Sequence, residues 1–162
     1  MDAVEYYSSI APSYEALYKE EQLEKIKRIV SLVPHTKSSK VLDIGAGTGL
    51  LEENLRECKI IALEPSEMAD FLEAKKLPNV KVLRLKVSQF KSDEKFDLVF
   101  CITVLQDLAK AERERCIKSA FAFCKHGGRI VISVLEASKI DLGYLKPILT
   151  EKVANDKVYV FG

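Results

Sequence analysis

Residues 41–50 constrain the fold of this chain more than any other stretch. The apolar run Val41-Leu42-Asp43-Ile44 predicts a buried strand, and Gly45, Gly47 and Gly49 follow it at alternate positions. Helical spacing resumes directly afterwards. A strand, a glycine turn and a helix start are typical of a site for a nucleotide-containing cofactor. Glycine suits the turn because a positive φ costs other residues ~1–2 kcal/mol.

A second acidic residue lies where a ribose would be bound. The apolar run Ile60-Ile61-Ala62-Leu63 ends at Glu64-Pro65. An acid about 20 residues past such a turn, at the end of the next strand, holds ribose hydroxyls through charge-assisted hydrogen bonds. Glu64 could instead be an ordinary solvated acid, but the spacing favours the ribose role. Asp43 lies inside a strand and needs buried partners, which we expect to be the N–H groups of the glycine loop.

The spacing of the glycines separates two kinds of cofactor. A dinucleotide site has the pattern G-x-G-x-x-G, and its third glycine is replaced here by Leu50. The stretch resembles motif I of the class I S-adenosylmethionine-dependent methyltransferases, V-L-D-I-G-x-G-T-G. This resemblance implies that S-adenosylmethionine is the cofactor and that Asp43, Gly45, Ala46, Gly47, Gly49 and Glu64 contact it.

The rest of the chain alternates strand and helix patterns. Strands are predicted at 59–63, 80–85, 96–102 and 129–135, with helices at 50–57, 66–75 and 110–124. This alternation predicts an α/β, doubly wound domain. The resemblance implies a mostly parallel, Rossmann-like sheet of about seven strands flanked by helices, with an antiparallel pair at its C-terminal edge.

We expect one methyltransferase domain over 1–162. Its parts are an N-terminal lid and helix (1–35), a cofactor-binding core (40–135), and a C-terminal helix with closing strands (136–162). Within the last part, 139–149 is predicted to be helical, and the two strands flank a turn at Asn155-Asp156. Residues 125–128, Lys-His-Gly-Gly, predict a turn that stops the preceding helix.

The tyrosine-rich segment 3–18 resembles the lid of small-molecule methyltransferases, "(F/Y)-x-x-I-A-x-x-Y-D". This places Tyr14 near the methionine end of the cofactor and Tyr6 or Tyr7 beside the substrate. Alternatively, the segment is a packed helix with its tyrosine hydroxyls in water. Pro12 is expected to divide it into two pieces. Residues 20–33 predict an amphipathic helix with Lys and Glu opposite its apolar face.

Further cofactor contacts follow from the resemblance. Pro65, Ser66 and Met68 are expected near the adenine, although Met68 also fits a core position. Many relatives carry Gly-Asp after the third strand, where this chain has Leu85-Lys86 followed by Val87-Ser88. Lysine cannot accept a hydrogen bond from the adenine amino group. Adenine recognition is therefore expected from the Val87 backbone or from Ser88.

The end of the fourth strand, Ile102-Thr103 and the residues to 108, resembles motif IV and should lie at the transferred methyl group. Many relatives have V-L-H-H there, but this chain has Gln106-Asp107 and thus lacks the histidine base. Asp107, Tyr7 and Tyr14 are the candidate catalytic residues. Asp107 fits equally well as the cap of the 110–124 helix.

Composition excludes several other classes of site. Lys and Arg total 25 against 24 Asp and Glu, a net charge of +1, so binding of nucleic acid by charge is not indicated. Four cysteines without C-x-x-C spacing and only two histidines predict no metal site. No apolar run is long enough to span a bilayer. We therefore expect a cytoplasmic protein that does not act at a membrane.

The leading hypothesis is transfer of a methyl group from S-adenosylmethionine to a small molecule by in-line displacement. The acceptor would be enclosed by the lid, residues 103–109 and residues 135–147. The alternative is a cofactor-binding subunit that needs a partner or a homodimer to act on protein or RNA, with a basic rim of Lys86, Lys91 and Lys139. A dinucleotide-dependent enzyme is disfavoured by Leu50.

Overall fold

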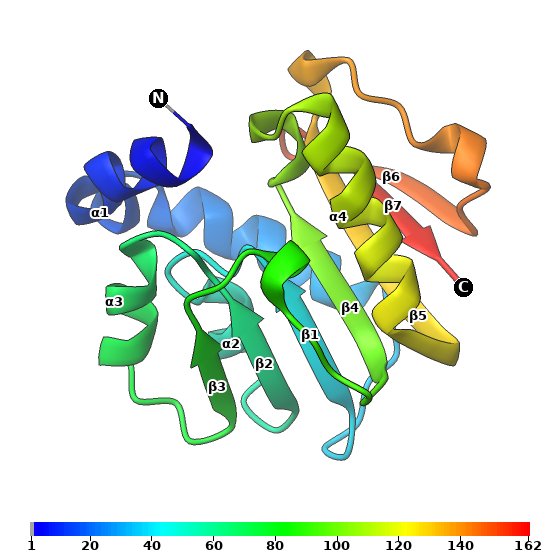
Figure 1. The fold of residues 1–162 in the computed structure, drawn as a ribbon, viewed down its shortest axis with the longest axis horizontal. Coiled ribbons are helices and arrows are strands. Elements are labelled where there is room, and N and C mark those ends of the chain that lie inside the picture. The colour runs from blue at the N-terminus through cyan, green and yellow to red at the C-terminus, as the bar shows by residue number, and fades with distance from the viewer. Residues whose placement is uncertain (1) are drawn as a thin grey trace.

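The computed structural model describes residues 2–162, apart from the side chains of residues 15–18. Within this part, seven strands form one sheet in the order β3-β2-β1-β4-β5-β7-β6 (Figure 1). The first five pair in parallel, and β7 runs antiparallel to both of its neighbours. The predicted doubly wound sheet with an antiparallel C-terminal pair is thus confirmed. The strands are β1 (Lys40–Ile44), β2 (Lys59–Leu63), β3 (Val80–Leu83), β4 (Phe96–Ile102), β5 (Cys124–Leu135), β6 (Leu149–Val153) and β7 (Asp156–Phe161).

Helices cover both faces of the sheet. Figure 1 shows α4 in front of the sheet and α2 behind it. No helix within residues 2–162 combines the length and the apolar composition needed to cross a membrane. The α-helices are α1 (Ala3–Ser31), α2 (Leu50–Asn54), α3 (Met68–Ala74) and α4 (Lys110–Phe123). Short 3₁₀ turns are η1 (Val87–Gln89), η2 (Leu105–Asp107), η3 (Glu136–Ser138) and η4 (Gly143–Leu145).

The core has two layers because the strands are apolar on both faces. Leu98 and Phe100 of β4 join a cluster with α1, α2 and α3. Val99 and Cys101, which alternate with them, join a second cluster with α4. This parity also assigns polar residues to a face, since residues two apart along a strand share a side.

Pro12 does not divide the N-terminal segment, contrary to the prediction. One helix, α1, contains it, although Figure 1 shows this helix to be bent. An interior proline costs a helix ~3 kcal/mol because it lacks an N–H and its ring clashes with the preceding turn. Other contacts offset this cost here. Asp2 and Glu5 form a capping box at the helix start, and Ser8 Oγ accepts a hydrogen bond from the Glu67 N–H.

The predicted turn at residues 125–128 is also wrong, because β5 follows α4 directly. The pairing of β4 with β5 shifts between Phe96–Cys124 and Leu98–Arg129, which makes these residues an irregularity within the strand. Gly127 has φ +81°, and a Cβ on Gly128 would lie 2.7 Å from the Asp97 carbonyl oxygen. The two glycines therefore serve a bulge instead of a helix stop.

Two side chains of α4 have contacts outside the helix. Phe121 is 39% exposed and has its ring 5.2 Å from that of Phe161. Arg113 is half-buried and donates hydrogen bonds to the carbonyl groups of Leu105 and Leu108. Its guanidinium thus fixes η2 against the start of α4.

Residues 139–149 do not form the predicted helix. The segment contains η4 and irregular backbone, with Lys139 and Lys146 in the left-handed region at φ +58° and +57°. A left-handed residue ends a run of right-handed turns, and each of these lysines ends one 3₁₀ turn. The following hairpin turns at Ala154-Asn155, so Asp156, predicted as a turn residue, is the first residue of β7.

A substitution at Gly49 tests how closely the glycine loop packs on α3. A Cβ at Gly49, where φ is +93°, would lie 2.3 Å from Leu72 Cδ1. We expect Gly49→Ala to lower the free energy of unfolding by ~2–4 kcal/mol in urea denaturation, from backbone strain plus overpacking. Gly127→Ala is the control, because its φ is also positive but no atom lies within 4 Å of the added Cβ. Equal losses in the two variants would contradict the packing explanation.

Candidate active site

A cavity of about 290 Å³ lies beyond the carboxyl ends of β1 and β4, which are neighbours in the sheet. Strands connected on opposite sides leave a crevice at such a switch point, beyond their carboxyl ends. The glycine loop after β1 and the residues after β4 both line it. All of the predicted cofactor-binding residues except Gly49 line the cavity: Tyr14, Asp43, Gly45, Ala46, Gly47, Glu64, Pro65, Ser66, Met68, Val87, Ser88, Ile102 and Thr103.

The three glycines of the loop have different neighbours. A Cβ on Gly45 would lie 2.5 Å from Val104 Cγ2, and the Gly49 position packs on α3 as described. At Gly47, where φ is +59°, the nearest atom to an added Cβ would be Met68 Sδ at 3.8 Å. The space beside the Cα of Gly47 is therefore part of the cavity, and a ligand has room there to approach the backbone.

Glu64 is bound to the glycine loop and to the segment before α3. Its Oε2 accepts a hydrogen bond from the Gly47 N–H at 2.8 Å. Its Oε1 accepts from the N–H and the hydroxyl of Ser66, at 3.0 and 2.6 Å. A carboxylate has about four acceptor positions. Glu64 is 6% exposed and lines the cavity, so it can still accept from a ligand hydroxyl there.

Asp43 has a different partner from the one predicted. The loop N–H groups of Gly45 and Ala46 donate to the Leu63 carbonyl, and that of Gly47 donates to Glu64. Asp43 interacts instead with Glu52 of α2, which is fully buried. Glu52 was not identified from the sequence. Its position between the apolar residues of a very short helix gave no signal of burial.

The two buried carboxyl groups both have a raised pKa. Burial, followed by the negative charge and hydrogen bonding of Glu52, raises the pKa of Asp43 well above its usual range. Burial also raises the pKa of Glu52 to about 7, although the hydrogen bond from Asp43 and the charge of Lys75 lower it. Two adjacent carboxyl groups in a dry site oppose each other's ionisation, which is why the pKa of Asp43 is raised well above its usual range.

At the other side of the cavity, the predicted adenine region is closed by α4. Lys86, which replaces the usual acid, forms an ion pair of 3.7 Å with Glu112. Glu112 and Arg115 of α4 also line the cavity. Val87 and Ser88 lie in η1 as part of the same wall.

The N-terminal helix supplies the remaining wall. Tyr7 and Tyr14 line the cavity, as the resemblance implied, whereas Tyr6 does not and is 48% exposed. The Tyr7 hydroxyl donates to Asp107 Oδ2 at 2.6 Å. Burial and this hydrogen bond raise the pKa of Tyr7.

The alternative cap role of Asp107 is wrong, because Ala109 is the N-cap of α4 and no side chain caps it.

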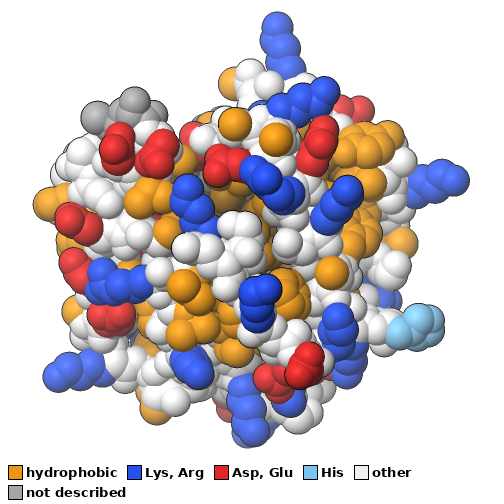
Figure 2. Space-filling model, viewed as in Figure 1, with side chains coloured by type: hydrophobic (Ala, Val, Ile, Leu, Met, Phe, Trp, Pro, Cys, Tyr) orange, Lys and Arg blue, Asp and Glu red, His pale blue; other side chains and the backbone are white. Residues whose placement is uncertain are grey.

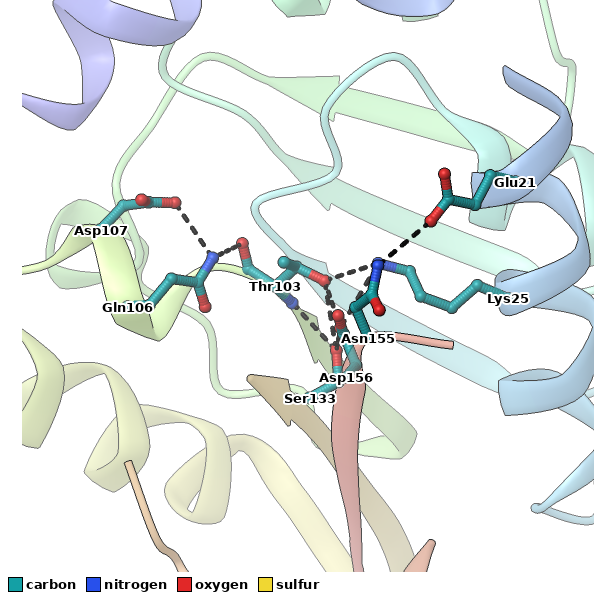
Figure 3. A network of polar contacts seen from close by, with 8 residues as sticks. All are labelled: Glu21, Lys25, Thr103, Gln106, Asp107, Ser133, Asn155 and Asp156. Atoms are coloured by element: carbon teal, nitrogen blue, oxygen red, sulfur yellow. Dashed lines mark hydrogen bonds and ion pairs between the residues drawn. The ribbon is translucent and has the colours of Figure 1, made fainter. Parts of the chain in front are cut away.

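A buried polar network holds the end of β4 (Figure 3). Asp156 Oδ2 accepts from the hydroxyls of Thr103 and Ser133, each at 2.6 Å, and from Lys25 Nζ at 3.3 Å. Lys25 also donates to Thr103 Oγ1 at 2.9 Å. Thr103 has φ +57°, a strained conformation for a β-branched residue. The network thus fixes a strained residue in the wall of the cavity.

Lys25, Ser133 and Asp156 were not identified from the sequence. The lysines of the 20–33 helix were expected outward, but Lys25 is 4% exposed. One signal was present: Asp156 alternates with Val158 and Val160, which face α1 in the core. Strand parity therefore places an acid on the α1 side, where a buried charge requires a partner.

The predicted basic rim is incomplete. Lys86 lines the cavity, whereas Lys91 and Lys139 do not. On the face in Figure 2, Lys and Arg side chains are dispersed with acidic side chains between them. This distribution does not favour a nucleic-acid substrate at this face.

A model of the methyltransferase domain family matches residues 18–161. The chain belongs to this family. It is 30% identical over 77 residues to (S)-coclaurine N-methyltransferase of Papaver somniferum, covering 42% of this chain and 22% of that protein. It is 27% identical over 137 residues to an uncharacterized methyltransferase of Oceanobacillus iheyensis, covering 79% of this chain and 64% of that protein. The chain thus spans less than two thirds of either relative.

The fold also matches solved methyltransferases. Magnesium protoporphyrin IX methyltransferase of Synechocystis PCC 6803, solved with bound S-adenosylmethionine, gives a TM-score of 0.77 at 15% identity, covering 97% of this chain and 93% of that one. Such low identity shows a shared fold. The predicted resemblance is therefore confirmed at the level of family and fold.

The Lys25 network of this methyltransferase is tested by removing the cation. We expect Lys25→Met to lower the free energy of unfolding by ~3–5 kcal/mol in urea denaturation, because Asp156 would remain buried without its cation. The double variant Lys25→Met/Asp156→Asn should recover part of this loss. Lys27→Met, which removes an exposed lysine of the same helix, should cost under ~1 kcal/mol. Additive losses in the double variant would contradict the pairing.

The carboxyl pair of this methyltransferase predicts a pH dependence. Because the pKa of Glu52 is raised from its usual value to about 7, the folded state binds more protons than the unfolded chain between pH 4.5 and 7. Stability should fall as pH rises through this window, by about 1.4 kcal/mol per pKa unit at most. Glu52→Gln should weaken the fall in melts at pH 5, 6, 7 and 8. Glu57→Gln, at an exposed carboxyl, should leave it unchanged.

Proposed function

We propose that this methyltransferase binds S-adenosylmethionine in the cavity and transfers its methyl group to a small-molecule acceptor by in-line displacement. The observation that supports this most is Glu64, a nearly buried acid that is tied to Gly47 and faces the cavity. Names of matched proteins add support, since coclaurine and magnesium protoporphyrin IX are small molecules.

The residues present fit this cofactor. Gly47 leaves space beside the backbone, and Glu64 provides acceptors for a ribose diol. Pro65, Ser66, Met68, Val87 and Ser88 form the wall proposed for the adenine. Ile102, Thr103 and Tyr14 are proposed to lie toward the methionine part. The bound cofactor supplies a methyl group that is already electrophilic.

The protein's own contribution is alignment. Positioning a nucleophile against the methyl group can provide an effective molarity of ~10⁵–10⁸ M, without a strong base. Thr103, fixed by Lys25 and Asp156, and Tyr7, fixed by Asp107, give two rigid points on either side of the acceptor end. Rigid walls of this kind keep the acceptor in line with the bond that breaks.

Calorimetric titration with S-adenosylhomocysteine, the demethylated product, tests the proposal. We expect binding to the wild type and a loss of about ten- to a hundredfold in affinity for Glu64→Ala, because the ribose hydrogen bonds are removed. NAD should not bind, since Leu50 occupies the position of the third dinucleotide glycine. The control is Glu67→Ala, which removes an exposed acid from the segment that follows Glu64. This variant should bind S-adenosylhomocysteine with unchanged affinity.

Absence of binding to folded wild-type protein would contradict the proposal. The alternative of a subunit that needs a partner would then take its place. Tighter binding of NAD than of the methionine-based ligand would favour a dinucleotide enzyme instead.

A further inference from the structure

Tyrosine and carboxylate side chains line the end of the cavity where the acceptor is expected. Resting on the proposed function, we propose that the methyl acceptor is an amine, held by Asp107 and the tyrosines of α1. Thr103 and Val104 after β4, Tyr7 and Tyr14 from α1, and Asp107 in η2 line this end. No histidine lines the cavity within the described residues, so proton acceptance falls to the carboxylate.

Asp107 is held by two donors but keeps an unused acceptor. The Tyr7 hydroxyl donates to Oδ2 at 2.6 Å, and Gln106 Nε2 donates to the same oxygen at 3.1 Å (Figure 3 shows the latter). Gln106 is itself fixed, because its Nε2 also donates to the Thr103 carbonyl at 2.6 Å. Among the residues described, none donates to Oδ1. The carboxylate is therefore oriented by the protein on one side and available to an N–H donor on the other.

The tyrosines favour a cation at the same place. Tyr7 and Tyr14 both line the cavity, and their rings meet edge to face with centroids 6.4 Å apart. An ammonium group is attracted electrostatically to the face of an aromatic ring, and more strongly where water is excluded. An anionic acceptor would gain nothing from these rings and would be repelled by Asp107.

The basic side chains of the cavity lie elsewhere. Lys86 is adjacent to Val87 in the proposed adenine wall and is paired with Glu112. Arg115 projects from the same helix as Glu112. Lys25 contacts Thr103, but it is buried, paired with Asp156 and not part of the cavity wall. An acidic acceptor would require a cation in the wall beside Thr103 and Tyr7, where the described structure places Asp107.

The groups present account for the proton and the electron pairs that move in the transfer. An amine that arrives protonated gives one N–H proton to Asp107 Oδ1, and the nitrogen lone pair forms the bond to the methyl carbon. The methyl–sulfur bond breaks, and its electron pair stays on sulfur. Because Asp107 is exposed, it then releases the proton to water.

Matched probes test the charge preference. Binding of 2-phenylethylamine, 2-phenylethanol and 3-phenylpropanoate to protein saturated with S-adenosylhomocysteine is measured by calorimetry and ligand-observed NMR. We expect the amine to bind at least tenfold more tightly than the alcohol and the acid. Asp107→Asn should remove this preference, and Tyr7→Phe should reduce it several-fold. Asp93→Asn, which removes the same charge from an exposed loop before β4, should leave it intact.

Three results would overturn the amine assignment. They are equal binding of the three probes, preference for the alcohol or the acid, and an unchanged preference in Asp107→Asn. Titration of S-adenosylhomocysteine into each variant is the internal control. If it binds but the amine does not, only the acceptor assignment fails. If it does not bind to the wild type, the proposed function fails with it.

Discussion

The buried Asp156 carboxylate connects parts of the chain that are far apart in sequence. One of its oxygens accepts hydrogen bonds from Lys25 of α1, Thr103 after β4 and Ser133 of β5. Two buried charges are expensive to remove from water, and their pairing with hydroxyl donors limits this cost. The contact holds α1 against the sheet and keeps Thr103 in a left-handed conformation. One carboxylate therefore links α1 to the residue after β4 that lines the cavity.

A second group of acids lies at the end of β1 and has a different consequence. Asp43, Glu52 and Glu64 are all nearly or fully buried, and they have distinct roles because their partners differ. Glu64 accepts hydrogen bonds from the Gly47 N–H and from the N–H and hydroxyl of Ser66. Burial raises the pKa of both Asp43 and Glu52, and the charge of Glu52 raises that of Asp43 further. The same end of the sheet thus has one acid that contacts the glycine loop and two acids that interact with each other.

The cavity wall carries charged groups from several elements. Its lining includes Glu64 bound to the glycine loop, the ion pair of Lys86 with Glu112 in the proposed adenine wall, and Asp107 bound to Tyr7. Such an arrangement orients a long ligand by charge as well as by shape.

Local pattern by itself determined the strands, the glycine loop and the position of Glu64, because apolar runs and glycine spacing act within a few residues. It also predicted the methyltransferase family and most of the residues that line the cavity. Tertiary structure decided what local signals could not: α1 continues through Pro12, residues 139–149 are not helical, and Asp43 pairs with Glu52. Lys25 and Asp156 are 131 residues apart, and a charge is driven to a buried partner only once packing has excluded water around both. Sequence spacing carries no record of that exclusion, so the network around Thr103 became visible only in the folded chain.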